Sequence, residues 1–215
     1  MSLVTRNILI ALCITAAIGG SVIYAVNHLN SLRIKDLESI QEKLSVETLS
    51  LETQISLLES ASCSVVGNGT DLTSELDELG QRLSYTENQL GSHDTQVIVL
   101  KQQYSLLEIR DYLMTKQLAK TCNTKQVTVL YFYSNDKTSC VDCDRAGYAL
   151  SYLHDTYPGI RVYSFDYNLD LGAQKTLISI EKIKGPLPAF VIDGKIHYGF
   201  TDLETLMQQF PKGAL

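Results

Sequence analysis

Cys140 and Cys143 are the residues of this sequence whose type and spacing could do chemistry. They stand two residues apart in the stretch TSCVDC, which begins at Thr138. Such a pair can open and close a disulfide, supply two of the four ligands of a zinc site, or do neither. A zinc site needs two more ligands, but there is no second pair of this kind, and His154 and His197 are scattered. We therefore predict no metal and no other cofactor, and a redox dithiol or an inert pair stay open.

The elements around the pair place it between a strand and a helix. The apolar run VTVLYFYS, residues 127–134, is β-branched and aromatic, which predicts a buried strand. An amphipathic helix is expected over residues 141–157. The unpaired amides and the dipole at a helix N-terminus favour a thiolate. We therefore expect Cys140, before the helix, to be exposed and reactive, and Cys143, one turn in, to be sheltered.

Further elements complete an α/β domain over residues 124–215. A second strand, a second helix, a β-hairpin with an Asp-Gly turn and a last helix are expected over 160–167, 171–184, 189–200 and 202–210. A helix joins the first two strands, so these strands should be parallel. The order β-α-β-α-β-β-α thus predicts a four-stranded mixed sheet with helices on both faces.

This domain resembles the thioredoxin-fold family in three places. A strand leads to the cysteine pair in YFYSNDKTSCVDC, GPLPAFVIDGK resembles the segment where a cis-proline precedes the third strand, and IDGKIHYGF resembles the terminal hairpin. The resemblance implies that Cys140 is the attacking cysteine, Cys143 the resolving cysteine and Pro188 the cis-proline. It also implies that the loop with Leu187 and Pro188 lies beside the dithiol and binds the backbone of the substrate.

The sequence departs from the pattern of the family around the dithiol. Ser139 stands in place of a tryptophan, Val141 and Asp142 replace glycine and proline, and Tyr131 occupies the position of a buried carboxylate. These differences concern the reduction potential of the pair, and therefore the direction of electron flow, more than they concern the fold.

Residues 1–28 predict a membrane anchor. The run ILIALCITAAIGGSVIYAV, residues 8–26, has no charged residue, and about 20 apolar residues in a helix span the hydrocarbon core of a bilayer. A cleaved signal peptide would have a shorter apolar run. We therefore expect a single-pass protein that has the lipid bilayer as a partner. A very short tail before the anchor and a large part after it favour an extracytoplasmic C-terminal domain.

Residues 29–123 predict a helical, coiled-coil-like stalk. The stretch contains no proline, and leucine recurs every seven positions from Leu37 to Leu58. Glycines and capping residues indicate breaks near 65–71 and 90–94. Three arrangements stay open. These are a parallel homo-oligomeric stalk, an antiparallel hairpin, and amphipathic helices that pack on the C-terminal domain.

The remaining cysteines offer a second disulfide. Cys63 and Cys122 both fall at the expected ends of helices, so a bond between them, bonds between chains and no bond at all stay open. The fifth cysteine, Cys13, lies in the apolar run. With an odd number of cysteines, a single chain cannot pair all of them.

Together these features predict a membrane-anchored thiol–disulfide oxidoreductase that acts on protein substrates and is recycled by a redox partner. The alternative is a non-catalytic coiled-coil scaffold on the membrane, whose thioredoxin-like head binds other proteins. The net charge of −6 argues against a nucleic-acid partner, because such proteins normally carry a basic face.

Overall fold

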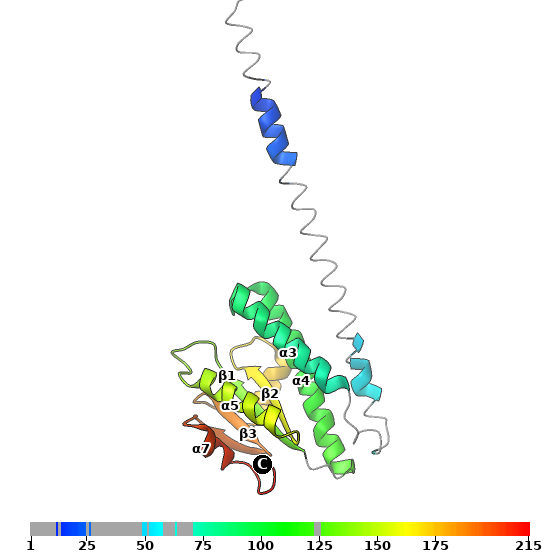
Figure 1. The fold of residues 1–215 in the computed structure, drawn as a ribbon, viewed down its shortest axis with the longest axis vertical. Coiled ribbons are helices and arrows are strands. Elements are labelled where there is room, and N and C mark those ends of the chain that lie inside the picture. Colours follow the sequence, from blue (N-terminus) through cyan, green and yellow to red (C-terminus); the bar gives the residue numbers. More distant parts are fainter. Residues whose placement is uncertain are drawn as a thin grey trace, which may run out of the picture. The chain divides into compact units, whose positions relative to one another are not determined.

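The computed structural model describes about three quarters of the chain. The described residues are 12, 14–24, 26, 49–50, 52–57, 63, 71–122 and 126–215. They belong to two units, residues 1–49 and residues 50–215. The helices and strands that surround the cysteine pair all lie in the second unit (Figure 1).

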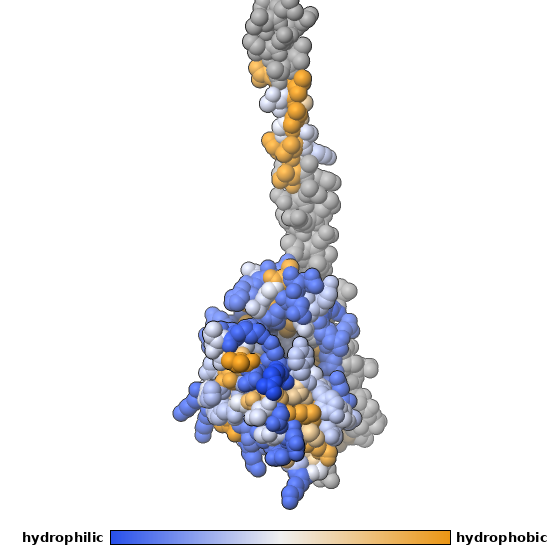
Figure 2. Space-filling view, turned by 60° about the vertical axis from the view of Figure 1, so that its left-hand side comes forward, coloured by the Kyte–Doolittle hydropathy of each residue, from blue (hydrophilic) through white to orange (hydrophobic). Residues whose placement is uncertain are grey.

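The described residues of the first unit are few and mostly apolar. Residues 14–24 are helical, and the side chains of Ile18 and Val22 are exposed. Figure 2 shows that the described side chains of this segment are mostly apolar. None of the helices in the described part of the chain is both long enough and apolar enough for a membrane span. The predicted anchor over residues 1–28 lies partly outside the described residues, and it stays a prediction.

Two long helices open the second unit. The helix α3 covers Asp71–Leu90, and α4 covers Thr95–Cys122. Gly91 turns the chain between them with a φ of 88°, a conformation that favours glycine. Asp94 caps α4, because its carboxylate accepts a hydrogen bond of 2.8 Å from the backbone N–H of Gln96. The turn falls within the predicted break near 90–94, whereas the other predicted break lies outside the described residues except at Asp71.

After α4, the described part of the second unit is one sheet with three helices. The strands are β1, β2, β3 and β4, over Val127–Tyr133, Ile160–Asp166, Ala189–Ile192 and Lys195–Tyr198. The helices are α5, α6 and α7, over Cys143–Thr156, Gly172–Ile180 and Leu203–Met207. The strand order is β2-β1-β3-β4, with β1 and β2 parallel and the other two pairs antiparallel. The predicted four-stranded mixed sheet is confirmed.

Helices cover both faces of this sheet, as predicted. Side chains alternate along β1, so Tyr131 faces α5 and α7, whereas Phe132 faces the opposite side. Leu150 of α5 and Leu206 of α7 pack on the first face. Leu177 of α6 packs on the second, together with Tyr112 and Ile109 of α4.

The helices end earlier than the sequence predicts. The second helix was expected to reach residue 184, but α6 ends at Ile180, and Lys182 adopts a left-handed φ of 57°. The last helix was expected over 202–210, but α7 spans Leu203–Met207. Asp202 caps it by accepting a hydrogen bond of 2.7 Å from the backbone N–H of Thr205. The hairpin turns at Asp193 as predicted, where φ is 48°.

The long helix α4 covers the edge of the sheet at β2. An uncovered edge strand leaves N–H groups without partners. One of these, the N–H of Ser164, donates to the carboxylate of Glu108 at 2.8 Å. Asp111 accepts hydrogen bonds from Arg161 at 3.0 Å and from the hydroxyl of Tyr163 at 2.7 Å. Two polar side chains of α4 thus bind the edge strand β2.

This packing revises the expectation of a free-standing stalk for residues 71–122. The helix α4 packs on β2 and α6, and α3 packs on α4. Helices that pack on the C-terminal domain are one of the three arrangements that the sequence left open. Asp111, a polar interruption in the apolar repeat, meets a partner on β2 there. For residues 29–70, most of which lie outside the described residues, an oligomeric coiled coil stays a prediction.

Glu108→Gln is expected to flatten the dependence of stability on pH. Burial raises the pKa of Glu108 well above its usual value near 4.5, more than the hydrogen bond from Ser164 lowers it. The neutral carboxyl therefore stabilises the fold at low pH, and this contribution is lost as the pH rises through the raised pKa. A neutral glutamine keeps the acceptor and loses the titration. Urea unfolding from pH 4 to pH 9 measures the effect, with the exposed Glu78→Gln as the control. Parallel curves for Glu108→Gln and the unsubstituted protein would contradict the expectation.

Candidate active site

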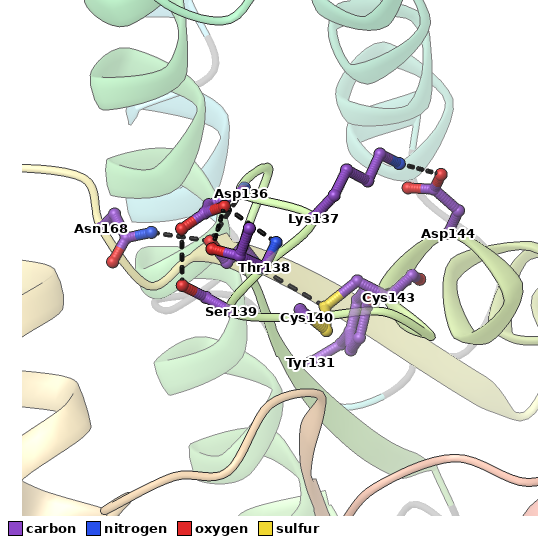
Figure 3. The surroundings of a disulfide bond; sticks show 10 residues. Tyr131, Asp136, Lys137, Thr138, Ser139, Cys140, Cys143, Asp144 and Asn168 are labelled. Atoms are coloured by element: carbon purple, nitrogen blue, oxygen red, sulfur yellow. Dashed lines mark hydrogen bonds and ion pairs between the residues drawn. A yellow bond between two sulfur atoms is a disulfide. The ribbon is translucent and has the colours of Figure 1, made fainter.

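The structure joins Cys140 to Cys143 by a disulfide between β1 and α5 (Figure 3). The two Cα atoms are 5.5 Å apart. Cys143 is the first residue of α5, where Asp142 holds the N-cap position. The sequence placed Cys143 one turn into the helix, so the helix starts two residues later than predicted. The loop from Ser134 to Asp142 contains a turn over residues 137–139, and residues 141 and 142 are bent, before the helix begins.

Both cysteines are buried in this state, which corrects the prediction for Cys140. The exposed fraction is 2 % for Cys140 and 3 % for Cys143. The sequence predicted an exposed Cys140, because a residue before a helix usually faces solvent. Instead, the loop folds back on itself, and the backbone N–H groups of Ser139 and Cys140 both donate to the carbonyl of Asp136 at 3.0 Å. A partner can therefore reach the Cys140 sulfur only after this loop moves.

Asp136 organises the loop with its side chain as well. Its carboxylate accepts hydrogen bonds from the hydroxyls of Thr138 and Ser139, both at 2.7 Å, and from the N–H of Thr138 at 2.9 Å (Figure 3). The hydrogen bonds from Ser139 and Thr138 lower the pKa of Asp136 from its usual value to about 2. Asp136 therefore keeps its charge, and the loop keeps these contacts, at any pH above about 4.

The other charged groups near the disulfide are paired. Lys137 forms an ion pair with Asp144. Arg145 pairs with Asp142 at 2.8 Å and donates to the carbonyl of Thr201 at 2.8 Å, which joins the start of α5 to the segment after β4. The aspartates around the pair are therefore partly compensated by neighbouring cations.

Two polar groups hold Cys143. The backbone N–H of Ser134 donates to the Cys143 sulfur at 3.4 Å. The Tyr131 hydroxyl donates to the Cys143 carbonyl at 2.5 Å, while its ring stacks on Phe190 with centroids 5.5 Å apart. Burial raises the pKa of Tyr131, so the hydroxyl stays protonated and remains a donor at neutral pH. Tyr131 thus acts as a neutral anchor for the start of α5.

Pro188 and Leu187 share a groove with the residues on either side of Cys140. The Leu187–Pro188 peptide bond is cis, and so is the bond before Pro186. Pro188 is buried, and its carbonyl accepts a hydrogen bond of 2.7 Å from the N–H of Gly199. Leu187 and Pro188 line a groove of about 440 Å³ together with the residues on either side of Cys140, namely Ser139 and Val141. Val141 is 79 % exposed, so it stands at the surface next to the groove.

Two further cysteines that the structure describes, Cys63 and Cys122, form a separate disulfide. A second disulfide joins Cys63 to Cys122 at the end of α4, before β1, whereas the first pair follows β1. Cys13 lies outside the described residues. Among the residues that the structure describes, no cluster of His, Cys, Asp and Glu side chains could hold a metal ion. His154 lies on α5 near Asp77, and His197 lies on β4.

The sequence did not identify Asp136 and Asn168, whose hydrogen bonds fix the loop next to the dithiol. Asp136 has a local signal, because aspartate two residues before threonine favours a turn closed by the side chain. Asn168 has no such signal. Its amide donates to the hydroxyl of Ser134 at 2.7 Å, and only the pairing of β1 with β2 brings these residues together.

The chain was compared with protein-family models, curated proteins and solved structures. No protein-family model and no curated protein matches the chain. Solved structures that match include thioredoxin O2 from Arabidopsis thaliana in the oxidized state. It is 19 % identical, the match covers 46 % of this chain and 84 % of that chain, and the TM-score is 0.33. This score is too low to support a conclusion. The class rests on the described residues: a mixed four-stranded sheet with a Cys-x-x-Cys disulfide at the start of α5, which agrees with the thioredoxin-like fold that the sequence predicts.

Proposed function

We propose that this protein is a thiol–disulfide oxidoreductase that acts through Cys140 and Cys143. The observation that carries the proposal is the position of their disulfide, between a buried strand and a helix N-terminus and beside the groove with Pro188. The amides and dipole at such a terminus stabilise a thiolate, which is the reactive form of cysteine. The pair can therefore both form and reopen its disulfide.

The reaction passes through a mixed disulfide. The Cys140 thiolate attacks one sulfur of a substrate disulfide, so a Cys140–substrate bond forms and the second substrate sulfur leaves as a thiolate. The Cys143 thiolate then attacks the Cys140 sulfur, closes the pair and releases the first substrate sulfur. Two electrons pass to the substrate, and the two cysteine protons end on its thiols. The reverse sequence oxidises a substrate dithiol.

The two cysteines have different surroundings, which supports this division of roles. The residues next to Cys140 line the groove, so a moderate movement of the loop would bring the Cys140 sulfur to a partner. Cys143 is held from inside by Ser134 and Tyr131. Cys140 is therefore the cysteine that meets the substrate, and Cys143 is the one that resolves the mixed disulfide.

Proteins are the proposed substrates. The open groove next to Leu187 and Pro188, of about 440 Å³, can receive an extended chain. A second redox partner must return the pair to its starting state after each turnover. We also propose that the predicted anchor of residues 1–28 holds the protein in a membrane with the dithiol outside the cytoplasm.

A non-catalytic binding head is the second candidate, and the burial of the disulfide favours it. With exposed fractions of 2 % and 3 %, the closed pair presents almost no surface to a partner. In that case the disulfide would only stabilise the loop, and the groove would bind a partner without chemistry.

Trapping on Cys143→Ser protein separates the two candidates. The reduced full-length variant, mixed with glutathione disulfide, is expected to hold glutathione on Cys140, because the resolving thiol is missing. Peptide mass spectrometry locates the adduct. The matched Cys140→Ser variant is expected to form at least tenfold less adduct on Cys143, since this sulfur lies behind the loop. Absence of an adduct on Cys140, in a protein whose unsubstituted form also fails to exchange with glutathione, would overturn the proposed function.

A further inference from the structure

A buried lysine of α4 joins α3 and α4 to the last residue of β2. The side chain of Lys101 is 3 % exposed, and its ammonium contacts Glu87 of α3 at 2.6 Å and Asp166 of β2 at 3.1 Å. A buried ammonium is stable only when it is paired and hydrogen-bonded. Lys101 therefore fixes these two carboxylates to one place.

The same two carboxylates hold the loop that carries the dithiol. The amide nitrogen of Asn135 donates to Glu87 at 2.9 Å and to Asp166 at 3.0 Å, on the oxygens that Lys101 contacts. Asn135 lies in the loop between β1 and Cys140. Asn135 thus binds one carboxylate of α3 and one of β2, and Lys101 of α4 binds the same two carboxylates.

Two connections lead from this cluster to the sulfur of Cys143. Asn135 directly follows Ser134, whose backbone N–H donates to that sulfur at 3.4 Å. Asp166 also accepts a hydrogen bond of 3.1 Å from the N–H of Asn168, whose amide in turn donates to the Ser134 hydroxyl at 2.7 Å. The backbone of Ser134 is therefore fixed from both sides.

The position of this N–H matters for the reduced pair. An N–H donor stabilises a thiolate more than it stabilises a disulfide sulfur, because hydrogen bonds to charged acceptors are stronger. A fixed Ser134 N–H therefore favours the reduced, thiolate form of Cys143. If the Ser134 N–H moves away from the Cys143 sulfur, the reduced form loses this stabilisation.

We propose that Lys101 and Glu87 are positioning residues of the dithiol, and that the α3–α4 helices set its reduction potential through Asn135 and Ser134. The inference rests on the proposed function. It assigns a role in the chemistry to a part of the chain that contains neither cysteine of the pair. The contact is made at the far end of α4 from the second disulfide.

The experiment is an equilibrium titration of the full-length protein with reduced and oxidised glutathione at pH 9. This pH is above the ordinary pKa of a thiol, about 8.5. Two glutathione thiols reduce one protein disulfide and yield one glutathione disulfide. Alkylation and peptide mass spectrometry report Cys140 and Cys143 separately from Cys63 and Cys122, which serve as an internal reference.

Lys101→Met is expected to make the equilibrium constant for reduction about tenfold smaller, a potential about 30 mV more negative. Methionine keeps the apolar stem and removes the charge. Asn135→Ala, an exposed position that leaves the buried ion pairs in place, should shift the constant in the same direction. Lys116→Met is the matched control, because this lysine of the same helix contacts Tyr112 and not the loop.

Each outcome decides one question. If the unsubstituted pair does not equilibrate with glutathione, the proposed function fails. If it equilibrates and both Lys101→Met and Asn135→Ala match the unsubstituted potential, the positioning role is overturned while the proposed function stands. A shift in Lys116→Met as large as in Lys101→Met would also overturn it. Should Lys101→Met not fold, Asn135→Ala alone decides.

Discussion

Replacing Cys63 and Cys122 together by serine is expected to lower the free energy of unfolding by about 4 kcal/mol. The two residues are 59 positions apart, and a disulfide that closes a loop of this length removes about that much conformational entropy from the unfolded chain. The bond also ties the segment with Ile55, which is buried against α3 and α4, to the end of α4. Urea unfolding followed by circular dichroism measures the change.

The dithiol pair offers the comparison for this experiment. Cys140 and Cys143 are three positions apart, so the same relation gives only about 2 kcal/mol for their joint replacement by serine. The long-range pair should therefore prove the more stabilising of the two. An equal or smaller loss for Cys63 and Cys122 would show that the entropy of the long loop does not control the stability.

Arg161→Met is expected to lower the free energy of unfolding by about 3 kcal/mol. Asp111 is fully buried between α4 and β2, and Arg161 is its cationic partner at 3.0 Å. Removing only the arginine leaves a buried carboxylate without a compensating charge, and this type of change is strongly destabilising. The Tyr163 hydroxyl still donates to Asp111 and compensates only part of the loss. The same unfolding assay measures the effect.

A double replacement tests the reason given for this loss. In Asp111→Leu with Arg161→Met, both charges are gone and apolar groups of similar size take their place. Such replacements are often nearly neutral. The double variant should therefore be more stable than Arg161→Met alone. If both variants lose the same amount, the cost comes from packing and not from the buried charge.

The sheet was predictable because its signals are local. A β-branched and aromatic run became β1, and Asp193 with Gly194 formed the expected hairpin turn. The four strands, their mixed directions and the helices on both faces follow from the order of these segments. The cysteine pair was also visible in the sequence, because both residues lie within one short stretch next to β1.

The arrangement behind the dithiol was not predictable, because it consists of contacts between distant residues. Asn135 meets Glu87 across 48 positions, and Lys101 meets Asp166 across 65. No periodicity in the sequence reports such pairs. The burial of Cys140 depends on the turn that Asp136 closes, and a helix-start pattern alone indicates an exposed cysteine there.

Three arrangements were open for the region that contains α4, and its ionisable residues distinguish a coiled coil from helices that pack on the sheet. A coiled coil would keep charged residues outside its seam. In α4, Lys101, Glu108 and Asp111 are buried, because each meets a partner on the sheet or in α3. Ionisable residues on the packed side of a helix therefore indicate that the helix packs against a surface with polar partners, and not against a second apolar seam.

The packing of α4 on β2 also limits where a truncated fragment of this protein can begin. Without α4, a fragment that begins at β1 would present the bare edge of β2, and unprotected edges recruit strands from other chains. The N–H of Ser164 would lose its acceptor there, and Arg161 would lose its counter-ion. The smallest soluble fragment of this protein therefore has to begin before the helices, even though the cysteine pair lies entirely after them.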